Sequence, residues 1–208
     1  MRLIRSLPLL LIAPFVAGCV SFSIFQGPET LEQGELTGGV AASFYSLPGD
    51  TAGDGQTGGP WPELGVRYGL GANLDLGVKF AGIPPFGTTY ADLRWQITDA
   101  PVPVTAGLGG SYVSWDPGNE TDTFSFSALY PSLAVGTDRL WVAGRGIIVS
   151  AGTTGDLFVA ERLWGIVAGT SIGDRVRLLP ELQVYFGEND PLVGLGLGLQ
   201  FRIREPEG

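Results

Sequence analysis

The chain has 208 residues and a formal net charge of −9, with a single cysteine and no histidine. The missing histidine excludes Ser-His-Asp and Cys-His catalysis, imidazole metal sites and a histidine pH switch. An acidic chain whose only lysine is Lys79 is not expected to bind nucleic acid. Charged residues make up only 16% of the chain and glycines number 33, so its composition departs from that of an ordinary soluble domain.

The N-terminus has the layout of an export signal. Arg2 and Arg5 precede an apolar run over 7–15, which is too short to cross a bilayer as a helix. Small residues then lead to the only cysteine, in the order Val16-Ala17-Gly18-Cys19. An ordinary secretory signal or a buried N-terminal helix is the alternative interpretation of this segment.

The stretch ending at Cys19 resembles the lipobox of a bacterial lipoprotein precursor. In that family the cysteine sulfur receives a diacylglycerol and the leader is removed. The resemblance implies a signal peptide over 1–18, a covalent lipid on Cys19 with no other cofactor, and a lipidated tether over 19–32. Lipidation would leave the chain without a thiol for a disulfide, a zinc site or a nucleophile.

After the leader, apolar and polar residues alternate with a period of two, which places them on opposite faces of β-strands. The clearest runs cover 74–80 and 193–203. No segment after the leader has a convincing helical period. The expected strands are 35–45, 61–70, 74–82, 88–98, 102–114, 123–135, 139–150, 157–170, 174–186 and 192–203.

The connections between these strands are predicted to alternate in length. Connections after odd-numbered strands are longer and rich in Gly, Pro, Asp and Asn, whereas those after even-numbered strands are tight turns. Strict alternation predicts an up-and-down meander whose two ends differ. The pattern over 33–204 is similar to that of small bacterial outer-membrane β-barrels of the OmpA/OmpW-like class. This resemblance implies an all-β fold, an up-and-down antiparallel transmembrane β-barrel of about ten strands.

In that class the short turns face the periplasm. Both termini would therefore be periplasmic, including a tail over 205–208, and the lipid on Cys19 would insert in the inner leaflet of the bacterial outer membrane. The implied partners are outer-membrane lipid, lipopolysaccharide, and the barrel-assembly and lipoprotein-sorting machineries.

The polar face of the predicted strands combines glycines with charges of both signs. This mixture predicts a narrow lumen filled by an ion-pair network, because small residues leave space for long side chains and barrels of about eight strands are filled by their own side chains. The expected network comprises Glu63, Arg67, Asp75, Lys79, Asp92, Arg94, Arg177, Glu181 and Arg202. The alternative is a lipid-anchored but water-soluble barrel that places Leu and Val inside around an apolar ligand.

Aromatic residues near the strand ends predict the interfacial belts of a membrane protein, since Trp and Tyr favour that position. The expected belt residues are Tyr45, Trp61, Trp115 and Tyr185 at one end and Trp95 and Trp141 at the other. Trp164 falls in the middle of a strand and does not fit this pattern.

Few residues are candidates for chemistry. The carboxylates of the polar face are expected to form salt bridges rather than to act as an acid–base pair, so we expect no enzyme activity and no metal centre. The longer connections carry acidic residues, which predicts either divalent-cation binding or simple solvation. The candidate cation-binding residues are Asp50, Asp54, Asp116, Glu120 and Asp122. The expected function is a non-enzymatic envelope role: structural, surface interaction or narrow passage of a small solute.

Overall fold

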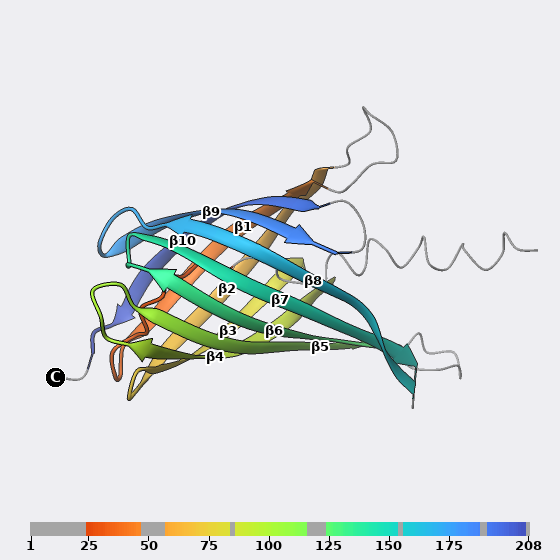
Figure 1. Ribbon diagram of the computed structural model, residues 1–208, viewed down its shortest axis with the longest axis horizontal. Coiled ribbons are helices and arrows are strands. Elements are labelled where there is room, and N and C mark those ends of the chain that lie inside the picture. The colour runs from red at the N-terminus through yellow and green to blue at the C-terminus, as the bar shows by residue number, and fades with distance from the viewer. Residues whose placement is uncertain are drawn as a thin grey trace, which may run out of the picture.

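The computed structural model describes residues 24–46, 57–83, 86–115, 124–153, 156–187 and 191–206. These residues form ten antiparallel strands that close into one barrel (Figure 1). The strands are β1 (Leu36–Ser46), β2 (Thr57–Gly71), β3 (Leu74–Ile83), β4 (Phe86–Thr98), β5 (Val104–Trp115), β6 (Phe124–Gly136), β7 (Leu140–Thr153), β8 (Asp156–Thr170), β9 (Val176–Phe186) and β10 (Leu192–Arg204). The predicted all-β, up-and-down antiparallel architecture is confirmed.

The barrel closes where β1 pairs with β10. The two strands are in register from Thr37 opposite Arg202 to Ser46 opposite Val193. Closure removes the exposed sheet edge, so each strand has a hydrogen-bonded neighbour on both sides. Because β1 begins and β10 ends at the same end of the barrel, the C-terminus lies there too (Figure 1).

The connection after β2 shows how tightly the chain reverses at this end. Ala72 and Asn73 have φ values of 50° and 59°, and they join Gly71 to its partner Leu74. Two successive residues in the left-handed region form the type I′ hairpin turn, whose twist matches that of the flanking strands. The end of the barrel that carries this turn, the β4–β5, β6–β7 and β8–β9 connections and the C-terminus is called the turn end below, and the opposite end is the loop end.

The predicted alternation of long and short connections is wrong at two places. The expected loops over 83–87 and 151–156 are each reduced to two residues between the paired ends of adjacent strands. Ile83 pairs with Phe86, and Thr153 pairs with Asp156. Antiparallel strands can pair until only a two-residue hairpin remains, so Gly and Pro content alone overestimated these loops.

Two prolines interrupt the ladder without ending a strand. At Pro131 the pairing of β6 with β7 is missing between Leu129 and Ser132, while the pairing of β6 with β5 continues through Leu108. The ladder between β8 and β9 likewise stops at Glu181, next to Pro180. A proline has no N–H to donate, so it is tolerated where one side of the strand is unpaired.

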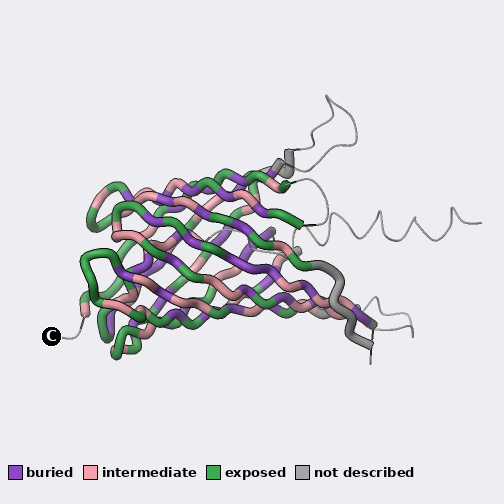
Figure 2. The backbone as a smooth tube through the Cα atoms, viewed as in Figure 1, coloured by how far each residue is buried: buried purple, intermediate pink, exposed green. Residues whose placement is uncertain are grey.

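The outer face of the barrel is apolar. In β10 the leucines at 195, 197 and 199 are exposed, whereas the glycines between them point inward and are buried. The same alternation of exposed and buried residues runs along the other strands (Figure 2). A water-soluble barrel would place these aliphatic side chains inside. The alternative of a soluble barrel with a Leu- and Val-lined interior is therefore contradicted by the side-chain arrangement.

The predicted aromatic belts are partly wrong. Trp95 is 53% exposed on the outer face, but Tyr45, Trp141 and Tyr185 are buried inside the barrel. Trp61 also packs against the interior. Position near a strand end did not reveal which face these residues occupy. Among the described residues, no helix is long and apolar enough to cross a membrane.

Candidate functional site

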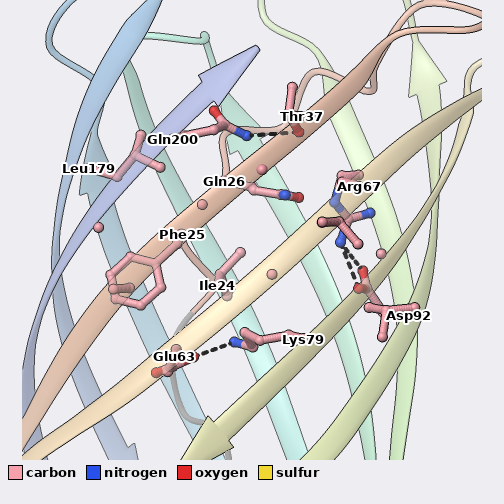
Figure 3. A pocket seen from close by; sticks show the side chains of 18 of the residues that line it. Ile24, Phe25, Gln26, Thr37, Glu63, Arg67, Lys79, Asp92, Leu179 and Gln200 are labelled. Atoms are coloured by element: carbon pink, nitrogen blue, oxygen red, sulfur yellow. Dashed lines mark hydrogen bonds and ion pairs between the residues drawn. The ribbon is translucent and has the colours of Figure 1, made fainter. Parts of the chain in front are cut away.

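An ion-pair cluster lies inside the barrel on the adjacent strands β2, β3 and β4. Arg94 donates from Nε and Nη2 to the two carboxylate oxygens of Asp75, at 3.0 and 2.7 Å. Arg67 donates to Asp75 and, from Nη2, to Asp92 at 2.6 Å (Figure 3). All four side chains are at most 8% exposed. Charges of opposite sign therefore pair with one another in a buried site.

A glycine in β3 provides the space for this cluster. Gly77 pairs with Arg67 on one side and with Asp92 on the other, so the Arg67–Asp92 contact passes over it. A Cβ at this position would overlap the guanidinium and the carboxylate. The glycines on the polar face thus make room for charged side chains.

Replacing Gly77 with alanine is expected to destabilise the barrel by about 1–3 kcal/mol, the usual cost of overpacking a tight interior. Urea unfolding in detergent micelles or lipid vesicles measures this change. The matched control is Gly144→Ala in β7, because a Cβ there meets nothing within 4 Å. Equal effects at the two positions would contradict the tight packing of the Arg67–Asp92 pair over β3.

A second pair lies farther along the same strands. Lys79 contacts the carboxylate of Glu63 at 2.8 Å, and the hydroxyl of Ser43 donates to the same carboxylate at 2.8 Å. The structure thus places the six predicted network residues of β2–β4 in two groups. The remaining three lie elsewhere. Glu181 is buried in β9, whereas Arg177 and Arg202 lie at the turn end and are part-exposed.

The loop-end half of the interior is aromatic and aliphatic, which the sequence analysis did not predict. The buried cluster there comprises Tyr45, Phe126, Ala128, Tyr130, Ile147, Val149, Val167 and Tyr185. Arg145 is buried beside it, with its guanidinium carbon 4.8 Å from the ring centre of Tyr130 and 5.7 Å from that of Tyr90. Arg145 lies an even number of residues from Trp141 and Ile147 in β7, so it is on the same face of the strand. This spacing is the sequence signal that could have placed Arg145 inside the barrel.

The segment expected as a tether enters the barrel. Residues 24–35, called the lumen segment below, precede β1 and lie against the inner face of the strands. At the turn end the segment pairs with β2, where Gly34 donates to the carbonyl of Gly69 at 3.0 Å and Gly69 donates to that of Glu35 at 2.9 Å. A Cβ at Gly69 would occupy the backbone of Glu32, so the glycine allows this close approach.

Side chains of the barrel hold the middle of the lumen segment. Arg94, already bound to Asp75, also donates to the carbonyl oxygens of Gly27 and Glu29, at 2.7 and 3.0 Å. The backbone N–H of Leu31 donates to Asp75 at 3.1 Å. The Arg94–Asp75 pair thus links β4 to β3 and also binds the segment. The ion-pair cluster and the lumen segment therefore form one site.

The N-terminal end of the segment reaches the middle of the barrel. The backbone N–H groups of Ile24 and Phe25 both donate to the carboxylate of Glu181, that of Ile24 at 3.0 Å. The ring of Phe25 lies against Gly196 and Gly198 of β10, where added Cβ atoms would come within 2.8–3.0 Å of it. Figure 3 shows Ile24 and Phe25 among the strands of the barrel wall. Ile24 also packs against the aromatic cluster of the loop-end half.

The space beside the N-terminal part of the segment is small, whereas an open recess of about 570 Å³ lies beside residues 29–33 at the turn end. A cavity of about 90 Å³ is lined by Ile24, Phe25, Arg145 and members of both ion-pair groups. This volume accommodates a few water molecules and no larger solute. In the described part of the chain, the lumen segment and the side chains around it fill most of this cross-section.

Several predicted residues lie outside the described residues. These are the lipidation site Cys19 and the candidate cation-binding residues Asp50, Asp54, Asp116, Glu120 and Asp122. Among the residues that the structure does describe, no group of three or more Cys, Asp or Glu side chains is arranged to hold a metal ion.

Comparison with known proteins finds similarity in structure alone. No protein-family model matches the chain, and no curated protein matches it in sequence. Similar structures include the COG4313 outer membrane channel from Pseudomonas putida F1, with 12% identity, a TM-score of 0.44, and coverage of 85% of this chain and 98% of that one. The N-terminal β-barrel domain of Pseudomonas aeruginosa OprF has 12% identity and a TM-score of 0.35, covering 82% and 100%.

A third similar structure is the translocator domain of the autotransporter NalP from Neisseria meningitidis. It has 11% identity and a TM-score of 0.37, with 96% of each chain covered. At this level of similarity, the function of none of these proteins is transferred to this chain.

Proposed function

We propose that the chain is a closed β-barrel lipoprotein of the bacterial outer membrane, with a non-enzymatic role as a structural or surface-interaction component of the envelope. The observation that carries the proposal is the combination of an apolar outer face with an interior filled by the lumen segment. A lipid-facing barrel needs the first feature, and a barrel without a resting open pore has the second.

The outer face supports the membrane location. Large apolar side chains are exposed on every strand that has described side chains, from Val40 and Phe44 in β1 to Phe201 and Ile203 in β10. Soluble monomers rarely expose a continuous apolar surface of this extent. In hydrocarbon the backbone must be paired within the protein, and the closed ladder provides that pairing.

The interior disfavours resting passage of solutes. Arg94 and Asp75 bind the lumen segment across the barrel, and Glu181 binds its N-terminal end. Narrow solute passage therefore requires displacement of this segment. Lipidation at Cys19 rests on the lipobox resemblance, and it would add a second attachment to the membrane.

Electrophoresis of the detergent-extracted protein, unheated and boiled, tests the proposal. A closed barrel in the membrane is expected to migrate differently before and after boiling, and a Cys19→Ala chain is expected to retain this shift. The variant is also expected to stay in the outer-membrane fraction after a carbonate wash, because the strands hold it there. Loss of the variant into the wash, or an unchanged mobility, would contradict the transmembrane barrel.

A further inference from the structure

The lumen segment is held mainly through its main chain. Its N–H groups at 24, 25 and 31 donate to carboxylates, and the N–H of Thr30 donates to the side-chain oxygen of Gln96 at 3.0 Å. Its carbonyl oxygens at 27, 28 and 29 accept from Arg94 and Thr105. These partners come from β3, β4, β5 and β9, so the barrel wall surrounds the main chain of the segment with donors and acceptors.

One side chain of the segment is bound as closely as its backbone. Phe25 is 8% exposed and forms a buried cluster with Trp141 and Leu179. Gly196 and Gly198 leave the hollow in which its ring lies. In contrast, Glu32 and Gln33 are exposed. The interior therefore binds a peptide main chain together with one large apolar side chain near its N-terminal end.

Residues 24–33 close the interior through non-covalent contacts. Few of these contacts are backbone–backbone hydrogen bonds to a strand. The paired part of the segment is limited to the Gly34–Glu35 contact with Gly69, at the turn end. Residues 24–33 can therefore leave their partners while this contact and the β-ladders of the barrel remain intact. Glu181, which accepts from two main-chain N–H groups, and Arg94, which donates to two main-chain carbonyls, then become available to another peptide of the same chemistry.

We propose that the barrel interior is a binding site for a peptide, that residues 24–33 of the same chain occupy it at rest, and that this segment is displaceable. The ligand class is a peptide that is bound through its main chain and carries an aromatic residue near its N-terminal end. Displacement of the segment opens the barrel, and a bound peptide closes it again. The inference depends on the proposed function in one respect, namely that the closed barrel spans a membrane.

The full-length Phe25→Asp variant tests the inference in planar bilayers. The new carboxylate lies beside that of Glu181 and removes the buried ring, so the segment should leave while the binding site stays intact. We expect the variant to conduct ions under conditions in which the unaltered protein stays closed. The matched control is Gln33→Asp, which places the same charge at an exposed position of the segment and should stay closed.

A synthetic peptide then tests whether the open barrel binds the sequence of the segment. The acetylated peptide Ile-Phe-Gln-Gly-Pro-Glu-Thr-Leu-Glu-Gln, which corresponds to residues 24–33, should block the conducting Phe25→Asp barrel. N-methylation at the positions of Phe25 or Leu31 removes an N–H that donates to a carboxylate. Each methylation should raise the half-blocking concentration at least about tenfold. A peptide with Gln33 replaced by Ala should block as well as the parent.

Several results would overturn the inference. A Phe25→Asp barrel that shifts on boiling but stays closed would show that the segment does not close the interior. Equal block by methylated and parent peptides would show that the main chain is not recognised. A loss of the heat-dependent shift in the unaltered protein would instead refute the proposed function, so the two failures are distinguishable.

A second variant serves if Phe25→Asp does not fold. An added Cβ at Gly27 would lie 3.4 Å from the Cα of Asp138, so cysteines at the two positions are neighbours that can be tested for a disulfide. In the Gly27→Cys, Asp138→Cys chain, oxidation should abolish voltage-induced openings, and reduction should restore them. A reduced chain that never opens at any applied voltage would overturn the displaceable segment.

Discussion

An arginine in place of Leu197 should destabilise the barrel by about 2–4 kcal/mol in a lipid bilayer, the cost of a charge at the membrane midplane. Leu197 lies near the middle of β10 and is 51% exposed on the outer face. If the outer face contacts hydrocarbon, the new charge lies away from water. Urea unfolding of the protein reconstituted in phospholipid vesicles measures the effect.

The matched control for this prediction lies on the same strand and the same face. Ile203, at the turn end of β10, is 53% exposed, so it differs from Leu197 in position along the strand and hardly in exposure. Ile203→Arg should cost no more than about 1 kcal/mol, because a long side chain near the interface reaches water. Equal and small losses at both positions would indicate an outer face in water and would favour a soluble barrel.

Replacing Asp75 with asparagine should cost about 3–5 kcal/mol, because it leaves two buried guanidinium groups without their shared carboxylate. Asp75 is 0% exposed and accepts from both Arg67 and Arg94. It also accepts the N–H of Leu31, so the variant weakens the attachment of the lumen segment. We expect both a lower unfolding free energy and more frequent openings in planar bilayers.

An exposed ion pair at the turn end supplies the control. Arg139 donates to Asp174 at 2.6 Å, but their side chains are 54% and 86% exposed. The same Asp→Asn change at Asp174 should have little effect on stability, since exposed pairs contribute little. If Asp75→Asn were as mild as Asp174→Asn, the buried cluster would not stabilise the barrel.

The strands could be predicted because the outer face of each is apolar, whereas the inner face carries the glycines and charged side chains of a crowded interior. This arrangement produces a period of two, which is strongest in β3 and β10. The strand bounds differ from the expected ones by at most four residues, and the largest difference is at the start of β2. The charged half of the site could be predicted from the same alternation, because Arg67, Asp75 and Asp92 occupy the polar positions of their strands.

The apolar half of the site could not be predicted from this pattern. In β7, Ile147, Ile148 and Val149 are consecutive, so alternation does not separate the inward from the outward residues. Tyr45 and Tyr185 occupy positions near strand ends that suit either a membrane interface or the interior. Only the closure of the barrel, which brings β1, β6, β7 and β9 around one volume, determines where these rings point.

No local sequence pattern predicts that the lumen segment lies inside the barrel. Residues 24–35 have no period, and Gly27-Pro28 is typical of a linker. Their conformation depends on partners distant in sequence, such as Glu181, which is 157 residues from Ile24. A tether and an inserted segment have the same composition, and they differ only in whether the barrel interior offers them hydrogen bonds.

Hydrogen exchange of the backbone amides of Ile24, Phe25 and Leu31, in the folded protein in detergent micelles, tests most directly whether the segment fills the barrel. We expect these amides to exchange at least about a hundredfold more slowly than in an unstructured peptide, because they donate to buried carboxylates. Exchange at the rate of the unstructured peptide, while the strand amides of β3 and β9 stay protected, would contradict the account.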